Sequence, residues 1–159
     1  LAKGKLVSLK NPFSFKYPSS GKNALTDGRI GSYNYSDGSW QGFEGTDLEA
    51  VIDLGNSIPV NEISIDFLYS PNDWIFLPEK VSFFTSTNGT NYSYIGEIHY
   101  KNNKPENINI VKRIEASQKL ENQQIRYIRV NAKSIKTCPG WHYGKGQKAW
   151  LFAGEIVVK

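Results

Sequence analysis

Apolar and polar residues alternate along much of this chain with a period of two. Apolar Ile63 and Ile65 are separated by Ser64 and Asp66, which predicts a strand with one face packed and the other in water. Turn-forming residues bound each such segment. Eight segments are therefore predicted as strands: 5–10, 48–55, 60–69, 79–86, 92–100, 108–116, 125–134 and 149–159.

The pattern predicts an all-β fold. Residues 115–124 carry the one helix-like pattern, but they are too polar to bury a helical stripe and are predicted as a loop between two strands. Aromatic residues make up 13% of the chain and Met is absent. Stacked antiparallel sheets are the natural way to bury these faces, so we predict a β-sandwich of jelly-roll type with about eight strands.

Length and charge narrow the class of protein. The 159 residues fit one domain, 1–159, with a sizeable core. The net charge of +4 comes from scattered cations, which does not indicate nucleic-acid binding. Cys138 is the single cysteine and excludes an internal disulfide. No apolar run approaches the roughly 20 residues that cross a bilayer.

A long connection, residues 23–55, carries a possible metal site. Asp27 stands at a tight turn, Ser32 follows five residues later, and Glu155 is an isolated carboxylate in an apolar stretch. Carboxylate, hydroxyl and carbonyl oxygens suit Ca²⁺. Equally, Asp27 could form an Asx-turn and Glu155 could face solvent at a strand end. The residues alone leave both interpretations open.

Two loops carry candidate stacking residues. Residues 70–78 present Trp74, and residues 138–146 present Trp141 after a Pro-Gly turn. A pyranose has a C–H face and a rim of hydroxyls, so its site needs an exposed aromatic plane with fixed donors and acceptors. Trp74 could instead cover the core, and Trp150, which precedes an apolar segment, is predicted to pack inside. The candidate ligand-binding residues of the two loops are Asn72, Trp74, Trp141, His142 and Tyr143, with His142 as a hydrogen-bond donor.

Five segments follow one another along the chain: "ALTDG" (24–28), "GSWQGFEGTDLEAVIDLG" (38–55), "WIFLPEKVSFFTSTNG" (74–89), "IRYIRVNA" (125–132) and "CPGWHYGKGQKAWLFAGEIVV" (138–158). In this order they resemble the coagulation factor type C, or discoidin, domain. More narrowly, they resemble the family 32 carbohydrate-binding modules of bacterial glycosidases, and in particular the C-terminal module of family 20 β-hexosaminidases from Bacteroidetes. The similarity covers nearly the whole chain.

This resemblance implies a galactose-binding-like jelly roll with a structural Ca²⁺. The matching side-chain ligands are Asp27, Ser32 and Glu155, and the matching carbonyls are those of Ala24, Arg29 and the residue one or two before Glu155. Gly154 stands where close relatives tend to carry Asp. The resemblance also gathers the two aromatic loops and the tip of residues 33–40, with Tyr35, at one end of the sandwich.

The function implied is that of a non-catalytic module. It would bind terminal sugars of galactose or N-acetylhexosamine type, at about 0.1 to 1 mM per site, and hold an attached glycoside hydrolase near glycans. We expect the chain to be part of a larger bacterial glycosidase that is secreted, periplasmic or on the cell surface.

Other functions were weighed against this one. The chain shows no carboxylate pair or nucleophile-base motif of a hydrolase, so an enzyme is not predicted. The alternative is a discoidin-type module for membrane or protein adhesion, with residues 74–77 as an apolar spike.

Overall fold

The computed structural model describes all residues, 1–159, as an antiparallel β structure. Its regular elements, in chain order, are β1 (Leu6–Leu9), the 3₁₀ helix η1 (Ala24–Thr26), β2 (Gln41–Glu44), β3 (Leu48–Tyr69), the 3₁₀ helix η2 (Pro71–Asp73), β4 (Lys80–Ser86), β5 (Ser93–His99), β6 (Lys112–Lys133) and β7 (Trp150–Val158). The predicted all-β sandwich is confirmed.

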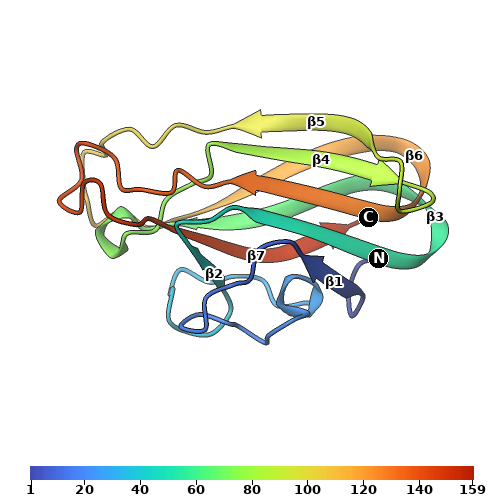
Figure 1. Ribbon diagram of the computed structural model, residues 1–159, viewed down its shortest axis with the longest axis horizontal. Helices are drawn as coiled ribbons and strands as arrows, with labels where there is room; N and C mark the ends of the chain where they lie inside the picture. The colour runs from blue at the N-terminus through green and yellow to red at the C-terminus, as the bar shows by residue number, and fades with distance from the viewer.

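Two long strands connect the layers of the sandwich. β3 and β6 have 22 residues each and pair with one another along most of their length. The first half of β3 also pairs with β1, and its second half pairs with β7. One layer is therefore β1-β3-β6-β4-β5 and the other is β6-β3-β7-β2 (Figure 1). Gly55 (φ 89°) and Asn122 (φ 50°) adopt left-handed backbone where these strands turn between the layers.

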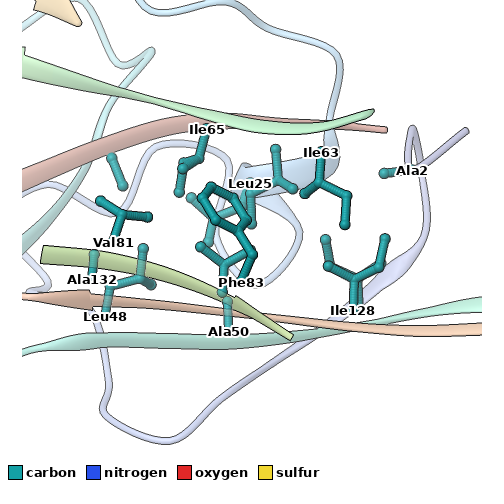
Figure 2. Close-up of a cluster of buried hydrophobic side chains, with 14 of the residues drawn as sticks. Ala2, Leu25, Leu48, Ala50, Ile63, Ile65, Val81, Phe83, Ile128 and Ala132 are labelled. Atoms are coloured by element: carbon teal, nitrogen blue, oxygen red, sulfur yellow. The ribbon is translucent and has the colours of Figure 1, made fainter. Parts of the chain in front are cut away.

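The hydrophobic core fills the space between the two layers. Ile63 and Ile65 of β3 meet Val81 and Phe83 of β4 across this space, as Figure 2 shows, and each is fully buried. Leu25 of η1 enters the same core and is also fully buried. η1 thereby fixes the start of the long connection against β7.

The structure has seven strands where the sequence predicted about eight. Residues 48–55 and 60–69 join into β3, because bulges between Asp53 and Ile58 and between Val60 and Glu62 turn the strand without ending it. Residues 115–124 were predicted as a loop and instead lie within β6, paired with β3. The short strand β2 carries only four residues, too few for a periodic pattern, and the sequence missed it.

One half of β3 is buried on both faces. The alternation predicted that Ser64 and Asp66 meet water, yet their exposed fractions are 2% and 4%. The long connection covers this outer face: Trp40 packs against Gly154, and Arg113 donates from Nη1 to the Gly31 carbonyl at 3.1 Å. The prediction was wrong because periodicity cannot show that a distant segment will cover the polar face.

The ends of the sandwich differ in what they carry. The chain termini meet, with the Leu1 amino group donating to the Val158 carbonyl at 2.6 Å. Figure 1 shows the β4–β5 turn and the bends of β3 and β6 at one end, and the loops that follow β3, β5 and β6 at the other. No helix here has the length and hydropathy to cross a membrane.

Candidate functional site

The loop after β3 presents Trp74 in an unusual backbone conformation. Trp74 directly follows η2 and caps it with φ 66° and ψ 20°, and its amide donates to the Pro71 carbonyl at 3.0 Å. Ser70 Oγ donates to Asp73 Oδ2 at 2.6 Å and closes the turn. A large residue with positive φ is uncommon and persists where its surroundings hold it. The turn leaves the indole half-buried at the surface.

A second tight loop, residues 138–147, lies beside the first. Across its base the Cys138 amide donates a hydrogen bond to the Gln147 carbonyl at 2.8 Å, and within the loop the His142 amide donates to the Pro139 carbonyl at 3.0 Å. This loop places Trp141 half-buried, His142 buried and Tyr143 exposed. Gly144 is needed here, because a Cβ would lie 2.6 Å from the Trp74 ring.

Hydrogen bonds join these two loops at Tyr143. Trp74 Nε1 donates to the Tyr143 hydroxyl at 2.7 Å, and that hydroxyl donates to the Asn72 carbonyl at 2.5 Å. The Trp74 and Tyr143 rings meet edge to face, with centroids 5.6 Å apart. The Tyr143 side chain is fixed in this way while the residue remains 65% exposed.

The buried side chain of His142 links the two loops through hydrogen bonds. Its exposed fraction is 3%, its Nδ1 accepts from the Gly144 amide at 3.0 Å, and its Nε2 donates to the Pro71 carbonyl at 2.7 Å. These partners assign a neutral imidazole protonated at Nε2. The predicted role as a donor to a sugar hydroxyl is therefore corrected, because both nitrogens are already occupied.

Trp141 is anchored on the far side of the same cluster. Its Nε1 donates to the Asn102 carbonyl at 2.9 Å, and its ring meets Phe76 edge to face with centroids 6.1 Å apart. The Asn102 side chain in turn bonds both backbone groups of Leu77. Trp141 thus keeps part of its ring at the surface but cannot swing outward without losing a hydrogen bond.

We call Asn72, Trp74, Trp141 and Tyr143 the aromatic surface. None of these residues lines any of the three hollows of the molecule, so the aromatic surface is shallow and open to solvent. The apolar spike expected of an adhesion module is not formed: Ile75 and Phe76 are each 1% exposed and pack inside.

Tyr35 belongs to a neighbouring aromatic cluster that the sequence analysis did not identify. Its ring meets Tyr17 edge to face at 6.0 Å, and Tyr17 meets Trp150 at 5.1 Å. Burial, with the nearby Tyr35 and Asp73, raises the pKa of Tyr17. Asp73, the neighbour of Trp74 in the sequence, therefore places a negative charge near this cluster. The signal in the sequence was only the "KYP" segment before the long loop, which has no alternating pattern.

Asp27 lies close enough to Glu155 for its negative charge to raise the pKa of that carboxyl group. Asp27 Oδ1 accepts from the Arg29 amide at 2.8 Å, the Asx-turn that the sequence also allowed, and its Oδ2 accepts from Ser20 Oγ at 2.5 Å. Ser32 is turned elsewhere, because its hydroxyl donates to Asp37 Oδ2. Ala24 opens η1 and Arg29 follows the turn, so both stand close in sequence to Asp27.

Glu155 is buried without full compensation. It is 4% exposed, which excludes the solvent-facing interpretation, and its Oε2 has no hydrogen-bond partner. Desolvation, together with the negative charges of Asp27 and Asp66, raises the pKa of Glu155 to about 7. The Gly28 amide and the Lys3 ammonium favour the charged form but do not offset the burial.

Asp66 is a third acidic residue here, and the sequence analysis placed it in solvent. Its Oδ2 lies 3.5 Å from Arg113 Nε without forming a hydrogen bond, and desolvation raises its pKa. We call Asp27, Asp66 and Glu155 the acidic base. The structure has no group of three or more His, Cys, Asp or Glu side chains arranged to hold a metal. A cation here would need hydroxyl and carbonyl oxygens beside the carboxylates.

The sequence matches no protein-family model and no curated protein. Solved structures match over nearly the full chain. The family 32 carbohydrate-binding module CpGH89CBM32-4 of Clostridium perfringens, in complex with GlcNAc-α-1,4-galactose, is 16% identical, covers 99% of this chain and 92% of that chain, and has a TM-score of 0.56. Chitosan-binding module 1 of a Paenibacillus sp. IK-5 chitosanase/glucanase is 13% identical over 99% and 95%, with a TM-score of 0.59.

A third match is the lectin domain of lectinolysin in complex with Lewis B antigen. It is 15% identical, covers 99% of this chain and 94% of that chain, and has a TM-score of 0.57. The C-terminal domain of a chitobiase from Bacteroides fragilis is 19% identical, covers 100% of this chain and 95% of that chain, and has a TM-score of 0.49. At such low sequence identities, the matches to the two binding modules and the lectin domain establish the fold and nothing more. The chain has the β-sandwich fold of the family 32 carbohydrate-binding modules.

Proposed function

We propose that this chain is a non-catalytic carbohydrate-binding module that binds terminal sugars through the aromatic surface. The observation that carries the proposal is Tyr143, a residue that is 65% exposed while its hydroxyl is fixed between Trp74 and Asn72. An aromatic ring held rigid in solvent loses little conformational freedom when a ligand stacks on it.

The surface offers both kinds of contact that a pyranose needs. Trp74, Trp141 and Tyr143 supply aromatic area, and the exposed side chains of Asn72 and Lys145 supply polar groups at its edge. The site is shallow and buries few atoms, so we expect affinities of about 0.1 to 1 mM for one sugar. Tethering to an enzyme would raise effective retention.

The ligands of similar structures support a glycan as the partner. One similar module was solved with GlcNAc-α-1,4-galactose and a similar lectin domain with Lewis B antigen. We therefore propose galactose or N-acetylhexosamine as the sugar class. In this proposal the module targets an attached bacterial glycoside hydrolase to glycans outside the cytoplasm, in the periplasm, at the cell surface or in secreted form.

We also propose a structural Ca²⁺ at the acidic base. The unpartnered, buried Oε2 of Glu155 and the neighbouring Asp27 carboxylate are what a hard cation would neutralise. Carbonyls of Ala24 and Arg29 would complete the shell. Ser32 fits less well, because its hydroxyl would have to leave Asp37. The bound ion would fix the long connection to β7 and has no part in catalysis.

A glycan array on the isolated domain, followed by calorimetry with the best sugar, tests the proposal. We expect Tyr143→Ala to weaken binding by about tenfold or more, because the stacking ring is lost. Tyr94→Ala is the matched control, because Tyr94 is 57% exposed on β5 and stands outside the aromatic surface. Equal loss in both variants, or no glycan bound at all, would contradict the proposal.

Liposome sedimentation separates this function from lipid adhesion. The buried side chains of Ile75 and Phe76 leave no apolar spike for a membrane. We therefore expect no salt-sensitive pelleting with phosphatidylserine vesicles. Such pelleting, without sugar binding, would favour an adhesion module instead.

A further inference from the structure

One of the three hollows lies beside the β4–β5 turn. Figure 1 places that turn at the end of the sandwich opposite the loops that carry the aromatic surface. The volume of this hollow is about 300 Å³, the lower end of the range for small-molecule sites. We call it the polar hollow. It is lined by the β4–β5 turn and by β6 where that strand bends: Thr85, Ser86, Thr87, Asn88, Asn91, Ser93, Gln123 and Gln124.

The wall formed by the β4–β5 turn is built rigidly. Ser86 Oγ donates to Asn88 Oδ1 at 3.1 Å, and Asn88 Oδ1 also accepts the amides of Thr90 and Asn91 at 2.9 Å each. Gly89 lies over the Tyr127 ring, and a Cβ there would come within 3.1 Å of it. These contacts give the turn one conformation before any ligand arrives.

An aromatic stack secures the outer side of the same turn. The Arg129 guanidinium lies 4.4 Å from the ring centroid of Phe84 and 4.4 Å from that of Tyr92. Tyr92 comes directly after Asn91 and before Ser93, so the stack positions both of these lining residues. The hollow is therefore a formed feature of the surface.

The lining side chains that remain have no protein partner. Thr85 lines the floor of the hollow and is only 2% exposed. The hydrogen bonds of the turn use Ser86 and Asn88, and they leave the side chains of Thr87 and Asn91 free. Gln124, paired through its backbone with Pro59, presents a free amide from the opposite wall.

We propose that the polar hollow is a second saccharide site, independent of the aromatic surface. None of its eight lining residues is hydrophobic, and none carries a charge, which disfavours an ionic ligand or an apolar peptide side chain. Hydroxyls and amides on every wall match a neutral, hydroxyl-rich molecule the size of one pyranose. Because no aromatic plane lines the hollow, hydrogen bonds alone recognise the sugar.

Amide chemical-shift titration of the ¹⁵N-labelled domain tests this site residue by residue. The probes are galactose, glucose, N-acetylgalactosamine and N-acetylglucosamine, each alone. We expect at least one of them to shift the amides of residues 85–93 and 123–124 in a saturable way. The shifts of Trp74 and Tyr143 report the proposed function separately, so either site can fail without the other.

Two threonines of the same turn provide matched variants. Thr87 lines the hollow and Thr90 does not, and both are exposed, so neither substitution threatens the fold. We expect Thr87→Val to weaken binding at the polar hollow by about tenfold, Gln124→Ala to do the same, and Thr90→Val to leave it unchanged. The shifts at the aromatic surface should persist in all three.

Two outcomes would overturn the proposal. The first is that no sugar moves residues 85–93 or 123–124, which would make the hollow a solvated turn. The second is that Thr87→Val and Thr90→Val weaken those shifts equally, which would place the sugar outside the hollow.

Discussion

The aromatic surface and the acidic base differ in whether their polar side-chain atoms have hydrogen-bond partners. At the aromatic surface, Trp74 Nε1, Trp141 Nε1 and the Tyr143 hydroxyl each have a hydrogen-bond partner within the protein. At the acidic base, one oxygen each of Asp66 and Glu155 is buried without such a partner.

This difference separates two kinds of binding site. A satisfied surface keeps its conformation without a ligand, so a weakly bound sugar has little ordering to do and removing the sugar costs the fold nothing. A buried carboxylate with an open lone pair is unfavourable until a cation or proton arrives. A cation that binds at the acidic base should therefore stabilise the domain. A sugar that binds at the aromatic surface should leave the stability of the domain nearly unchanged.

The largest expected effect is that of Ca²⁺ on stability. Without a cation, the folded chain binds the Glu155 proton more tightly than the unfolded chain does, because the pKa rises from 4.5 to about 7. Stability is then lost as the pH rises through this window, by roughly 3 kcal/mol above it. We expect Ca²⁺ to raise the melting temperature by about 5–10 °C at alkaline pH and by much less at acidic pH, as measured by calorimetry.

Glu155→Gln is the control for this effect. The amide carries no charge, so the metal-free variant should gain stability at alkaline pH and lose its response to Ca²⁺. A melting temperature of the original protein that ignores both chelator and pH would contradict the metal assignment and leave Lys3 as the counter-charge of Glu155.

The next effect is structural and concerns His142. Replacement with Ala removes both hydrogen bonds and opens a gap between the two loops, which leaves the Pro71 carbonyl and the Gly144 amide unpaired. We expect a loss of about 2–3 kcal/mol in the free energy of unfolding, measured by denaturant titration. His99→Ala should cost far less, because that side chain is exposed on β5. If both variants lost the same stability, His142 would not hold the loops.

The smallest effect separates the ring of Tyr143 from its hydroxyl. Tyr143→Phe keeps the stacking plane but removes the link between Trp74 Nε1 and the Asn72 carbonyl. We expect stability to fall by about 1 kcal/mol and sugar affinity to fall only a few-fold, as calorimetry would show. A loss as large as that of Tyr143→Ala would mean that the hydroxyl, and not the ring, contacts the sugar.

Most strands could be predicted because the alternation of apolar and polar residues depends only on the segment itself. Segments 79–86, 92–100 and 149–159 overlap β4, β5 and β7 closely. The prediction failed where contacts with residues far along the chain determine the structure. The bulges that join segments into β3 depend on pairing with β6, and the burial of Ser64 and Asp66 depends on the covering segment around Gly31.

The same distinction holds for the candidate residues. The pattern of loops located Trp74, Trp141 and Tyr143 at the surface of the molecule. It could not show that His142 points inward, because that orientation depends on a carbonyl about 70 residues away along the chain, the one of Pro71.

Indole N–H signals in an NMR titration test the central claim most directly. The chain has four tryptophans, and Trp40 is an internal control because it is buried and its Nε1 donates to the Ser32 carbonyl at 2.9 Å. On titration with galactose or N-acetylhexosamines, the indole signals of Trp74 and Trp141 should shift in a saturable way while that of Trp40 stays fixed. Sugars that move neither Trp74 nor Trp141 would contradict a binding site on the aromatic surface.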